Sequence, residues 1–337
     1  MREESGDGGD ERCLEGRSAR RCPVSADEIY QAVTDRMVQA LERGVVPWRT
    51  PWSLAGRPRS MSTGNPYRGV NTWLLALASR EHGWQSPWFG TYGQIQERGG
   101  QVRKGEKSTL VTFWKTLEKQ ERDPGTGEVT TRAVPMLRKF RVFNADQADG
   151  LPSRFHPELG EERPIAGPRA VLDAYVSQPG APGLSHDVQG QAYYNPVADE
   201  IHLPPISGHR SPEHYYATAY HEAAHSTGHA SRLNRTGITS QDATFGSHEY
   251  GKEELVAQMT ASMLCAETGI GTDEIFQNSA AYIGGWLQTI KGEPRMVISA
   301  AAAAQKATDT ITEPSRQALP EPEPATRPAP DHEIEAA

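Results

Sequence analysis

Two histidines and a glutamate in one short stretch carry the strongest chemical signal in the sequence, His221–Glu222–Ala223–Ala224–His225. Four residues span about one helical turn, so on a helix His221 and His225 lie on one face, where two imidazoles can bind one Zn²⁺. Glu222, next to the first ligand, can act as general base on a water molecule at the metal. The pattern therefore predicts a zinc-dependent hydrolase.

A catalytic zinc site also needs a third protein ligand and leaves one position for water. The longer pattern H-E-x-x-H-x-x-G-x-x-H, in which a third histidine completes the set, is only half present. Gly228 fits it, but Ser231 stands at the position of the third histidine and His229 falls two residues early. This class of zinc site is therefore rejected.

The other source of a third ligand is a carboxylate on a following helix. Glu254 lies 29 residues after His225, which leaves room for a loop and a returning helix. Leu255, Val256 and Met259 mark the core side of that helix, and Glu254 borders this side. We predict Glu254 as the ligand, with Glu253 as the alternative. A third possibility remains open, in which both glutamates only interact with the dipole of the helix N-terminus.

Other residues bear on the reaction that the site performs. Hydrolysis of a carbonyl compound needs an oxyanion stabiliser, for which Tyr250 and His248 are candidates. Zinc deaminases carry a Pro-Cys-x-x-Cys pair, which is absent. The three cysteines are Cys13, Cys22 and Cys265, and they form neither a disulfide framework nor a zinc knuckle.

The elements that must position this site are read from residues 168–312. Ser211 is a suitable cap and Pro212 suits the first turn of the motif helix. Apolar spacing predicts a buried helix over Glu253–Cys265, with Cys265 on its buried face. Three further helices and two short strands complete this predicted domain, at 168–177, 280–290 and 296–311 and at 191–196 and 200–204.

The N-terminal part differs in charge from the rest of the chain. The whole chain has a net charge of −8, yet residues 43–141 carry 17 basic against 7 acidic side chains. A basic segment joined to an acidic one indicates that the first part binds a polyanion. Predicted helices at 26–43 and 70–80 and a hairpin of strands 108–114 and 137–144, with its tip at 123–127, form this part.

Aromatic residues are concentrated in the same basic segment, which contains six of the seven tryptophans. Aromatic rings that stack with bases, with basic side chains along the phosphates, are typical of proteins that bind single strands. Any single tryptophan, in contrast, is expected in the core. The predicted DNA contacts come from the first aromatic stretch, a turn-rich loop and a glycine-flanked basic loop: Arg49, Asn65, Tyr67, Arg68, Asn71, Arg103, Lys104 and Lys107.

The sequence thus predicts an α+β protein with two domains, at 25–150 and 168–312, joined by a proline-rich linker at 151–167. Residues 1–24 and 313–337 have the composition of disordered tails. No apolar stretch approaches the length of a membrane span, and the N-terminus lacks a signal-peptide core. A cytoplasmic location is therefore expected, with no membrane partner.

Several motifs of both halves, in order, resemble the ArdC-like antirestriction proteins and the related TraC-type plasmid primases. In the N-terminal half they are Gly64–Asn71, Gly99–Lys107 and Val142–Gln147. In the C-terminal half they are His221–His229, Arg232–Arg235 and Tyr250–Ala257. One departure is Gln258, where the family pattern usually continues with glutamate. This change weakens the expectation of a carboxylate behind the metal ligands, but it does not affect the predicted ligands themselves.

The resemblance implies a small domain of mixed sheet and helices that binds single-stranded DNA, followed by a mostly helical zincin-like metallopeptidase domain with a short edge sheet. It also implies a place on mobile elements that move by conjugation, and protection of incoming DNA from host restriction. Carried over to this sequence, it makes His221 and His225 zinc ligands, Glu222 the catalytic carboxylate, and the pair Glu253–Glu254 the source of the third ligand.

Three functions remain open at this point. The first is a zinc protease that acts on an unknown protein substrate at single-stranded DNA. The second is a DNA-binding protein in which the zinc fold is only structural, although a structural site needs no general base such as Glu222. The third is an accessory factor in replication or priming, but the N-terminal half shows no cluster of acidic residues for the two metals of a polymerase.

Overall fold

We describe the protein from a computed structural model, in which residues 25–49, 56–122, 129–156, 166–240, 247–271 and 280–318 are placed. The predicted N-terminal tail (1–24), the hairpin tip (123–127) and the last part of the predicted C-terminal tail (319–337) lie outside these residues. So do Cys13 and Cys22, and residues 157–165 of the predicted linker.

Helices make up most of the described chain, and their caps explain where several of them begin. Ser25 starts the first helix with a capping box, in which its side chain accepts from the Glu28 amide and Glu28 accepts from the Ser25 amide. The longer helices are α1 (Ala26–Glu42), α2 (Val70–His82), α4 (Pro168–Val176), α5 (Pro212–Ser226), α7 (His248–Glu267), α8 (Ala280–Gly292) and α9 (Met296–Gln317). Short ones are η1 (Pro47–Arg49), α3 (Tyr92–Gln96), η2 (Ala145–Gln147), η3 (Ser153–Phe155), η4 (Ile206–Gly208) and α6 (Thr236–Thr239).

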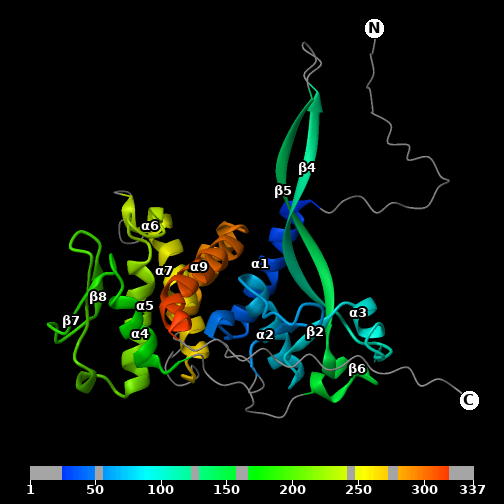
Figure 1. Cartoon of the computed structure of the whole chain (residues 1–337), viewed down its shortest axis with the longest axis horizontal. Helices are drawn as coiled ribbons and strands as arrows, with labels where there is room; N and C mark the ends of the chain where they lie inside the picture. Colours follow the sequence, from blue (N-terminus) through cyan, green and yellow to red (C-terminus); the bar gives the residue numbers. More distant parts are fainter. Residues whose placement is uncertain are drawn as a thin grey trace, which may run out of the picture.

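The N-terminal half is organised around a long antiparallel ribbon of β4 (Thr109–Arg122) and β5 (Val129–Asn144). Its base belongs to a four-stranded sheet of order β1-β2-β5-β4, with β1 (Arg59–Ser60) and β2 (Trp88–Gly90). A separate pair joins β3 (Gln101–Val102) to β6 (Ala148–Asp149). The outer part of the ribbon projects away from the body of the molecule (Figure 1). The predicted strand pair is therefore confirmed, and it is longer than the sequence suggested.

The C-terminal half is mostly helical, with one small sheet at its outer side (Figure 1). The sheet has the order β7-β9-β8 and consists of β7 (Gly183–Ser185), β8 (Tyr193–Asn195) and β9 (Glu200–His202). Helices α5 and α7 pack against each other, and α7 also packs along α9. The two helices that carry the candidate ligands are therefore fixed in the interior of this half.

One hydrophobic core crosses the boundary between the halves. Side chains of α1, η1 and α2 pack with side chains of α7, α8 and α9 in a single cluster. Trp48 and Trp286 meet edge to face at a ring distance of 5.6 Å across this boundary. Because large apolar surfaces from both halves are buried together, the N-terminal helices and helix α7 belong to one packed body.

A buried ion pair lies in the same boundary. Arg57 donates from Nη1 to Glu267 Oε1 at 2.7 Å, and from Nη2 to Gln305 Oε1 at 2.9 Å. Glu267 also accepts from Arg316 at 2.9 Å. The Arg57 and Glu267 side chains are only 10% and 5% exposed. This boundary is therefore specified by polar contacts as well as by apolar packing.

The α+β class is confirmed, and three predicted boundaries are corrected. Residues 151–156 belong to the N-terminal half rather than to a linker, because Phe155 is buried there against Trp88. Helix α9 runs to Gln317, so the chain is helical beyond the predicted start of the tail at 313. Helix α7 begins at His248, five residues before its predicted start, because Ser247 caps it by accepting from the Tyr250 amide.

None of the helices that the structure describes combines the length and the apolar character that crossing a bilayer requires.

Candidate metal centre and nucleic-acid surface

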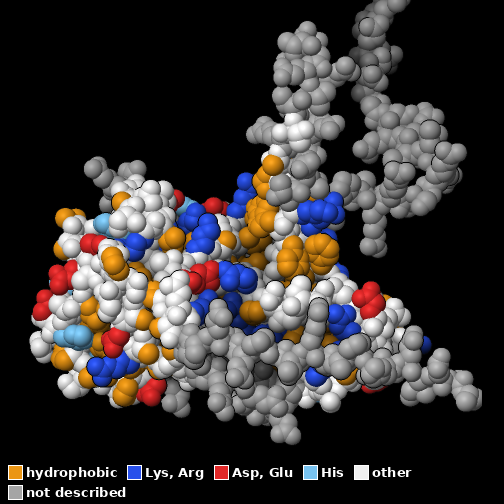
Figure 2. All heavy atoms as spheres, viewed as in Figure 1, with side chains coloured by type: hydrophobic (Ala, Val, Ile, Leu, Met, Phe, Trp, Pro, Cys, Tyr) orange, Lys and Arg blue, Asp and Glu red, His pale blue; other side chains and the backbone are white. Residues whose placement is uncertain are grey.

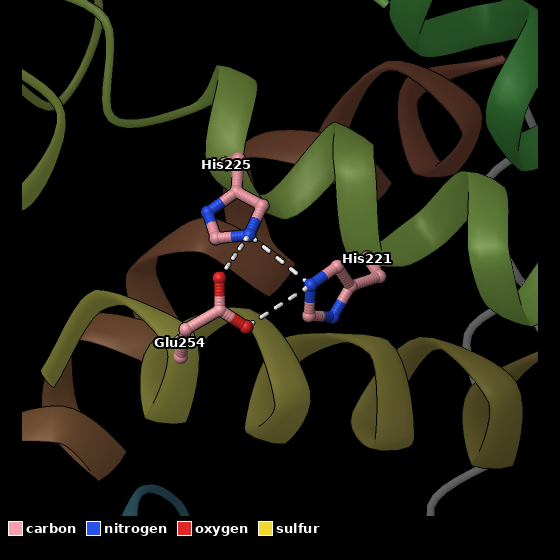
Figure 3. Close-up of side chains that lie close together, drawn as sticks. All are labelled: His221, His225 and Glu254. Atoms are coloured by element: carbon pink, nitrogen blue, oxygen red, sulfur yellow. Dashed lines mark hydrogen bonds and ion pairs between the residues drawn. The ribbon is translucent and has the colours of Figure 1, made fainter. Parts of the chain in front are cut away.

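The two motif histidines lie on the same face of α5, as their spacing predicts. Ser211 caps this helix by accepting from the His214 amide, and Pro212 occupies its first turn. The Nε2 atoms of His221 and His225 are 3.1 Å apart. Both rings point toward α7, where the Glu254 carboxylate faces them (Figure 3).

Glu254 completes a group of three donors. Its Oε2 lies 3.5 Å from His221 Nε2, and its Oε1 lies 3.4 Å from His225 Nε2. A tetrahedral zinc ion with ligand bonds near 2.05 Å would separate its donors by about 3.3 Å. The two ring nitrogens are therefore spaced like ligands of a zinc-sized ion, and each carboxylate oxygen lies at a similar distance from one of them. Among the described residues, no other group of three histidine, cysteine or acidic side chains comes together in this way.

Glu253 has a different position, on the far side of His225 from the three donors. Its Oε1 lies 3.2 Å from His225 Nδ1, the ring nitrogen that faces away from the donor group. Metal-bound histidines commonly donate this second nitrogen to a carboxylate, which sets the tautomer and the direction of the ring. The alternative that Glu253 is itself the ligand is therefore not favoured by the geometry.

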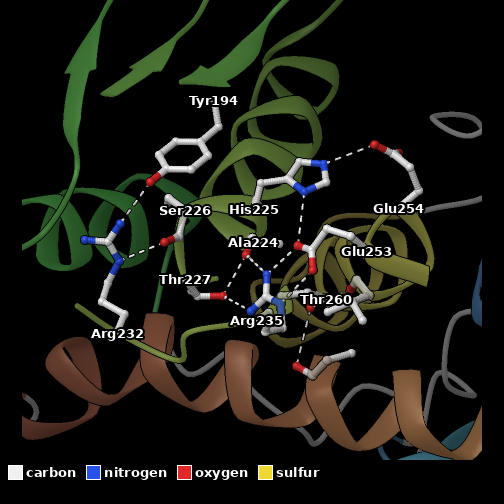
Figure 4. A network of polar contacts seen from close by, with 12 residues as sticks. Tyr194, Ala224, His225, Ser226, Thr227, Arg232, Arg235, Glu253, Glu254 and Thr260 are labelled. Carbon is white, nitrogen blue, oxygen red and sulfur yellow. Dashed lines mark hydrogen bonds and ion pairs between the residues drawn. The ribbon is translucent and has the colours of Figure 1, made fainter. Parts of the chain in front are cut away.

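Arg235 holds Glu253 in place (Figure 4). Its guanidinium donates from Nε to Glu253 Oε2 at 2.8 Å, and from Nη1 to Thr227 Oγ1 at 2.7 Å. It also donates to the carbonyl of Ala224 near the end of α5. Burial alone would raise the pKa of Glu253, but hydrogen bonds from Arg235 and His225 outweigh it and lower this pKa. Glu253 is therefore held as a buried carboxylate.

The positioning role of Arg235 is not predicted from the sequence, although Arg235 lies in the motif Arg232–Arg235. A second arginine of that motif, Arg232, ties the loop after α5 to the small sheet. It donates to the Asp199 carboxylate, to the Ser226 carbonyl at 2.8 Å and to the Tyr194 hydroxyl at 3.3 Å (Figure 4). Both roles could have been inferred from the position of Arg232 and Arg235, because these two arginines lie between the two helices that carry the predicted ligands.

The general-base candidate Glu222 borders the same group. It is 8% exposed, and its carboxylate makes no hydrogen bond or ion pair to another residue that the structure describes. A buried carboxylate without a fixed protein partner is available to exchange a proton with a small molecule. The geometry is therefore compatible with the predicted role of Glu222.

The two candidates for an oxyanion stabiliser differ in their surroundings. Burial, followed by the neighbouring Glu254 carboxylate, raises the pKa of Tyr250 to about 12, and Glu222 adds to this effect. Tyr250 is thus a neutral hydrogen-bond donor beside the donor group. His248 instead lies 2.6 Å from Glu293, on the exposed start of α7. The structure favours Tyr250.

The structure separates the predicted DNA-binding residues into exposed and buried side chains. Asn65, Arg68, Arg103, Lys104 and Lys107 are exposed, and they remain predictions. Two of them already have acidic partners, since Arg68 pairs with Asp309 of α9, and Arg103 with Glu106 and Asp149. The backbone of Arg49 lies in η1, but its side chain is outside the described residues.

Tyr67 and Asn71 require a correction, because both side chains are buried, with 6% and 5% exposure. Tyr67 packs edge to face on Phe89 in the core below the ribbon. The Asn71 amide donates to the Thr112 carbonyl at 2.7 Å and accepts from the Thr112 amide at 2.8 Å. Both residues support strand β4 and are not available to contact DNA.

Comparisons with known proteins place the two halves in described families. Residues 27–143 match the family model for the N-terminal domain of anti-restriction factor ArdC. Residues 171–303 match the model for a zincin-like metallopeptidase. The crystal structure of the antirestriction protein ArdC from plasmid R388 in its metal-free form is 40% identical, with a TM-score of 0.69, over 86% of this chain and 98% of that one. Its Mn(II)-bound form is 41% identical, with a TM-score of 0.68, over 85% and 98%.

Sequence relatives are longer or of similar length. A DNA primase TraC of Escherichia coli is 36% identical over 301 residues, which is 84% of this chain but 27% of that protein. The chain therefore spans about a quarter of that relative. The protein y4eC of Sinorhizobium fredii is 32% identical over 300 residues, covering 86% of this chain and 93% of the relative. Because both halves match in order and nearly the whole ArdC chain is covered, the chain belongs to the ArdC antirestriction family.

Proposed function

We propose that the protein is a metallopeptidase of the antirestriction class that acts at single-stranded DNA, on a protein found there. The observation that carries the peptidase assignment is the group of His221, His225 and Glu254, with the unpartnered Glu222 beside it. The DNA assignment rests on the basic N-terminal half and on its match to the ArdC N-terminal domain. Protection of incoming mobile-element DNA in a recipient cell is the task that fits both.

His221, His225 and Glu254 would hold the metal ion, for which Zn²⁺ is the proposed species. A bound Zn²⁺ supplies a Lewis acid that polarises the substrate carbonyl and acidifies a water molecule. Glu222 accepts the proton of the attacking water and returns it to the leaving amine. Tyr250, kept protonated by its raised pKa, donates a hydrogen bond to the oxygen on which charge develops.

An extended peptide also needs main-chain contacts, and β8 can provide them. This strand lies at the edge of the three-stranded sheet and contacts α5. Within the described chain it pairs on one side only, with β9. An edge of this kind adds an extended peptide as a further strand.

The decisive variant is Glu222→Gln, which keeps the size of the side chain and removes the base. We expect it to retain about one metal per chain by elemental analysis and to lose peptidase activity by at least about 100-fold. It should also lose protection of transferred DNA in recipient cells. Tyr250→Phe should keep the metal as well and lower kcat with little change in KM.

The same variant separates the candidate functions. Full protection by Glu222→Gln would contradict the peptidase and leave occupation of DNA as the protective act, with a structural metal. The TraC relatives are named as primases, whereas the group of metal-ligating side chains found among the described residues comes from α5 and α7 of the C-terminal half. Primer synthesis by the purified protein would be required before that function is considered.

A further inference from the structure

Large apolar side chains are exposed at the inner part of the β4–β5 ribbon, with Phe113 and Phe140 on one face and Trp114 on the other. Phe113, Trp114 and Phe140 are 43%, 57% and 42% exposed. The rings of Phe113 and Phe140 meet at 5.5 Å with an angle of 73°, so they form one continuous aromatic surface. Apolar side chains of this size that remain open to solvent in a group mark a binding surface.

The strand register shows which side chains share a face of the ribbon. Directly paired residues of antiparallel strands lie on the same face, and the pairs Val111↔Phe140, Phe113↔Arg138 and Lys115↔Met136 follow one another at intervals of two. One face therefore carries the two phenylalanines and, next to them along the ribbon, Arg138 and Lys115. We call this set of four side chains the ribbon platform.

The charge around the ribbon platform has a single sign. Segments 109–115 and 133–144 contain Lys115, Arg138, Lys139 and Arg141 and no aspartate or glutamate. These four side chains are exposed, and none of them forms an ion pair with another described residue. Figure 2 shows hydrophobic and basic side chains next to each other at the base of the ribbon. Exposed aromatic rings next to basic side chains suit a partner that carries both negative charges and flat aromatic rings.

Two residues of the motif Gly64–Asn71 support the ribbon platform, Tyr67 at its base and Asn71 at the edge of β4. The Tyr67 ring lies 6.2 Å from the Phe113 ring, at an angle of 46°. Asn71 bonds both backbone polar groups of Thr112, the residue directly before Phe113. The aromatic surface is therefore presented by a strand that is clamped at its edge, which lowers the entropic cost of binding.

We propose that the ribbon platform is the surface on which bases of single-stranded DNA stack. Phe113 and Phe140 contact base faces, and Arg138 and Lys115 contact the adjacent phosphates. The occupant is a single strand because bases inside a duplex do not expose their faces. This inference rests on the proposed DNA-binding function and extends it, because it assigns the contact to residues outside the loops that the sequence indicated.

The test uses the full-length protein and a fluorescein-labelled oligothymidylate, with affinity measured by fluorescence anisotropy. The double variant Phe113→Leu/Phe140→Leu keeps apolar packing but removes the stacking rings. Stacking contributes on the order of 1–3 kcal/mol per base, so we expect at least about a 10-fold loss of affinity. Phe113→Tyr/Phe140→Tyr should bind like the wild type, and the matched control Ile206→Ala removes an equally exposed apolar side chain from η4 in the other half without effect.

The phosphate contacts have a separate readout. Lys115→Gln/Arg138→Gln should lower the slope of log affinity against log salt concentration by about 0.7 for each charge removed. Thermal melting of each variant checks that the fold is retained. Addition of unlabelled duplex DNA should compete far less well than an unlabelled single strand.

Each outcome has one meaning. If the wild-type protein fails to bind the oligonucleotide, the proposed DNA-binding function itself is wrong. If the wild type binds and the leucine double variant binds equally well, only the ribbon platform is overturned and the loop residues Arg103, Lys104 and Lys107 become the candidates. Equal competition by duplex DNA would also overturn it, because stacking on exposed bases could not explain such binding.

Discussion

At the scale of residues, the His225 imidazole lies between two carboxylates, Glu253 and Glu254. Burial lowers the pKa of this imidazole, but Glu253 on one nitrogen and Glu254 on the other outweigh burial and raise it to about 10. Burial raises the pKa of Glu254, but hydrogen bonds with His221 and His225 outweigh burial and lower this pKa. His225 is therefore held in one orientation by charge on both sides.

The role of Glu253 leads to a prediction on metal affinity. Glu253→Gln keeps the shape of the side chain but weakens its bond to His225 Nδ1, and it breaks the charge pair with Arg235. Loss of a partner of this kind typically reduces metal affinity by about 10- to 100-fold. We expect that reduction in a titration of Zn²⁺ against a competing chelator.

Two comparisons make the result specific. Glu249→Gln, one turn earlier on the same helix, changes a carboxylate whose one hydrogen bond within the described part of the chain is to Thr236, and it should leave the affinity unchanged. Glu254→Gln should lose far more affinity than Glu253→Gln, because it removes a proposed ligand. A larger loss in Glu253→Gln would reverse the assignment of the two glutamates.

At the scale of elements, the site depends on a close approach of the short helix α6 to α7. A Cβ atom on Gly237 would lie 2.5 Å from Glu253 Cβ and 3.1 Å from the Glu249 carbonyl. In the loop after α5, a Cβ atom on Gly228 would lie 2.6 Å from the Ile238 side chain and 3.0 Å from the Arg235 guanidinium. Close packing therefore explains why a glycine stands at position 228. This explanation is independent of the longer zinc motif that the sequence partly matches.

This contact predicts that Gly237→Ala is disruptive although the residue is no ligand. The added methyl group must push α6 away from α7, because part of what it meets is backbone. We expect a destabilisation of about 1–3 kcal/mol in urea unfolding and weaker zinc binding, since Arg235 precedes α6 and would move with it. Gly190→Ala, where a Cβ meets nothing within 4 Å, serves as the control and should change neither quantity.

Several elements were predictable from the sequence because their signals are local. The spacing of His221 and His225, the cap at Ser211 and the β-branched strand 108–114 need no knowledge of distant residues. The roles of Tyr67 and Asn71 were mistaken because the turn before α2 and the first turn of α2 read as exposed, and only the packing of α2 against β4 buries them. Glu253 could be separated from Glu254 only when α5 and α7 were placed side by side.

At the scale of the whole molecule, the two family domains share a core and a buried ion pair. Burial lowers the pKa of Arg57, and the neighbouring Glu267 carboxylate opposes this effect. Glu267 belongs to α7, the helix that also carries Glu253 and Glu254. The N-terminal half is thus joined directly to the element that forms the metal site.

Removing one partner of this buried pair should destabilise both halves together. Arg57→Leu leaves Glu267 with Arg316 as its remaining cation, and we expect the free energy of unfolding to fall by about 3 kcal/mol. Urea unfolding followed by tryptophan fluorescence and by circular dichroism should give one transition with both probes.

The exposed pair of Arg295 and Asp27 provides the control. Both of its side chains are more than half exposed, so Arg295→Ala should leave the free energy of unfolding nearly unchanged. Two separate transitions in the wild type, or an unchanged stability of Arg57→Leu, would show that the halves fold independently.

The shared core also limits how this chain can be inherited. A recombination event that copied only one half would carry away helices whose apolar faces have lost their cover, and the product would be prone to aggregate. Selection should therefore keep the two halves as one transferable cassette, even inside a much larger protein. The alignment with the TraC relative, which extends over 84% of this chain within 27% of that protein, is consistent with such a cassette.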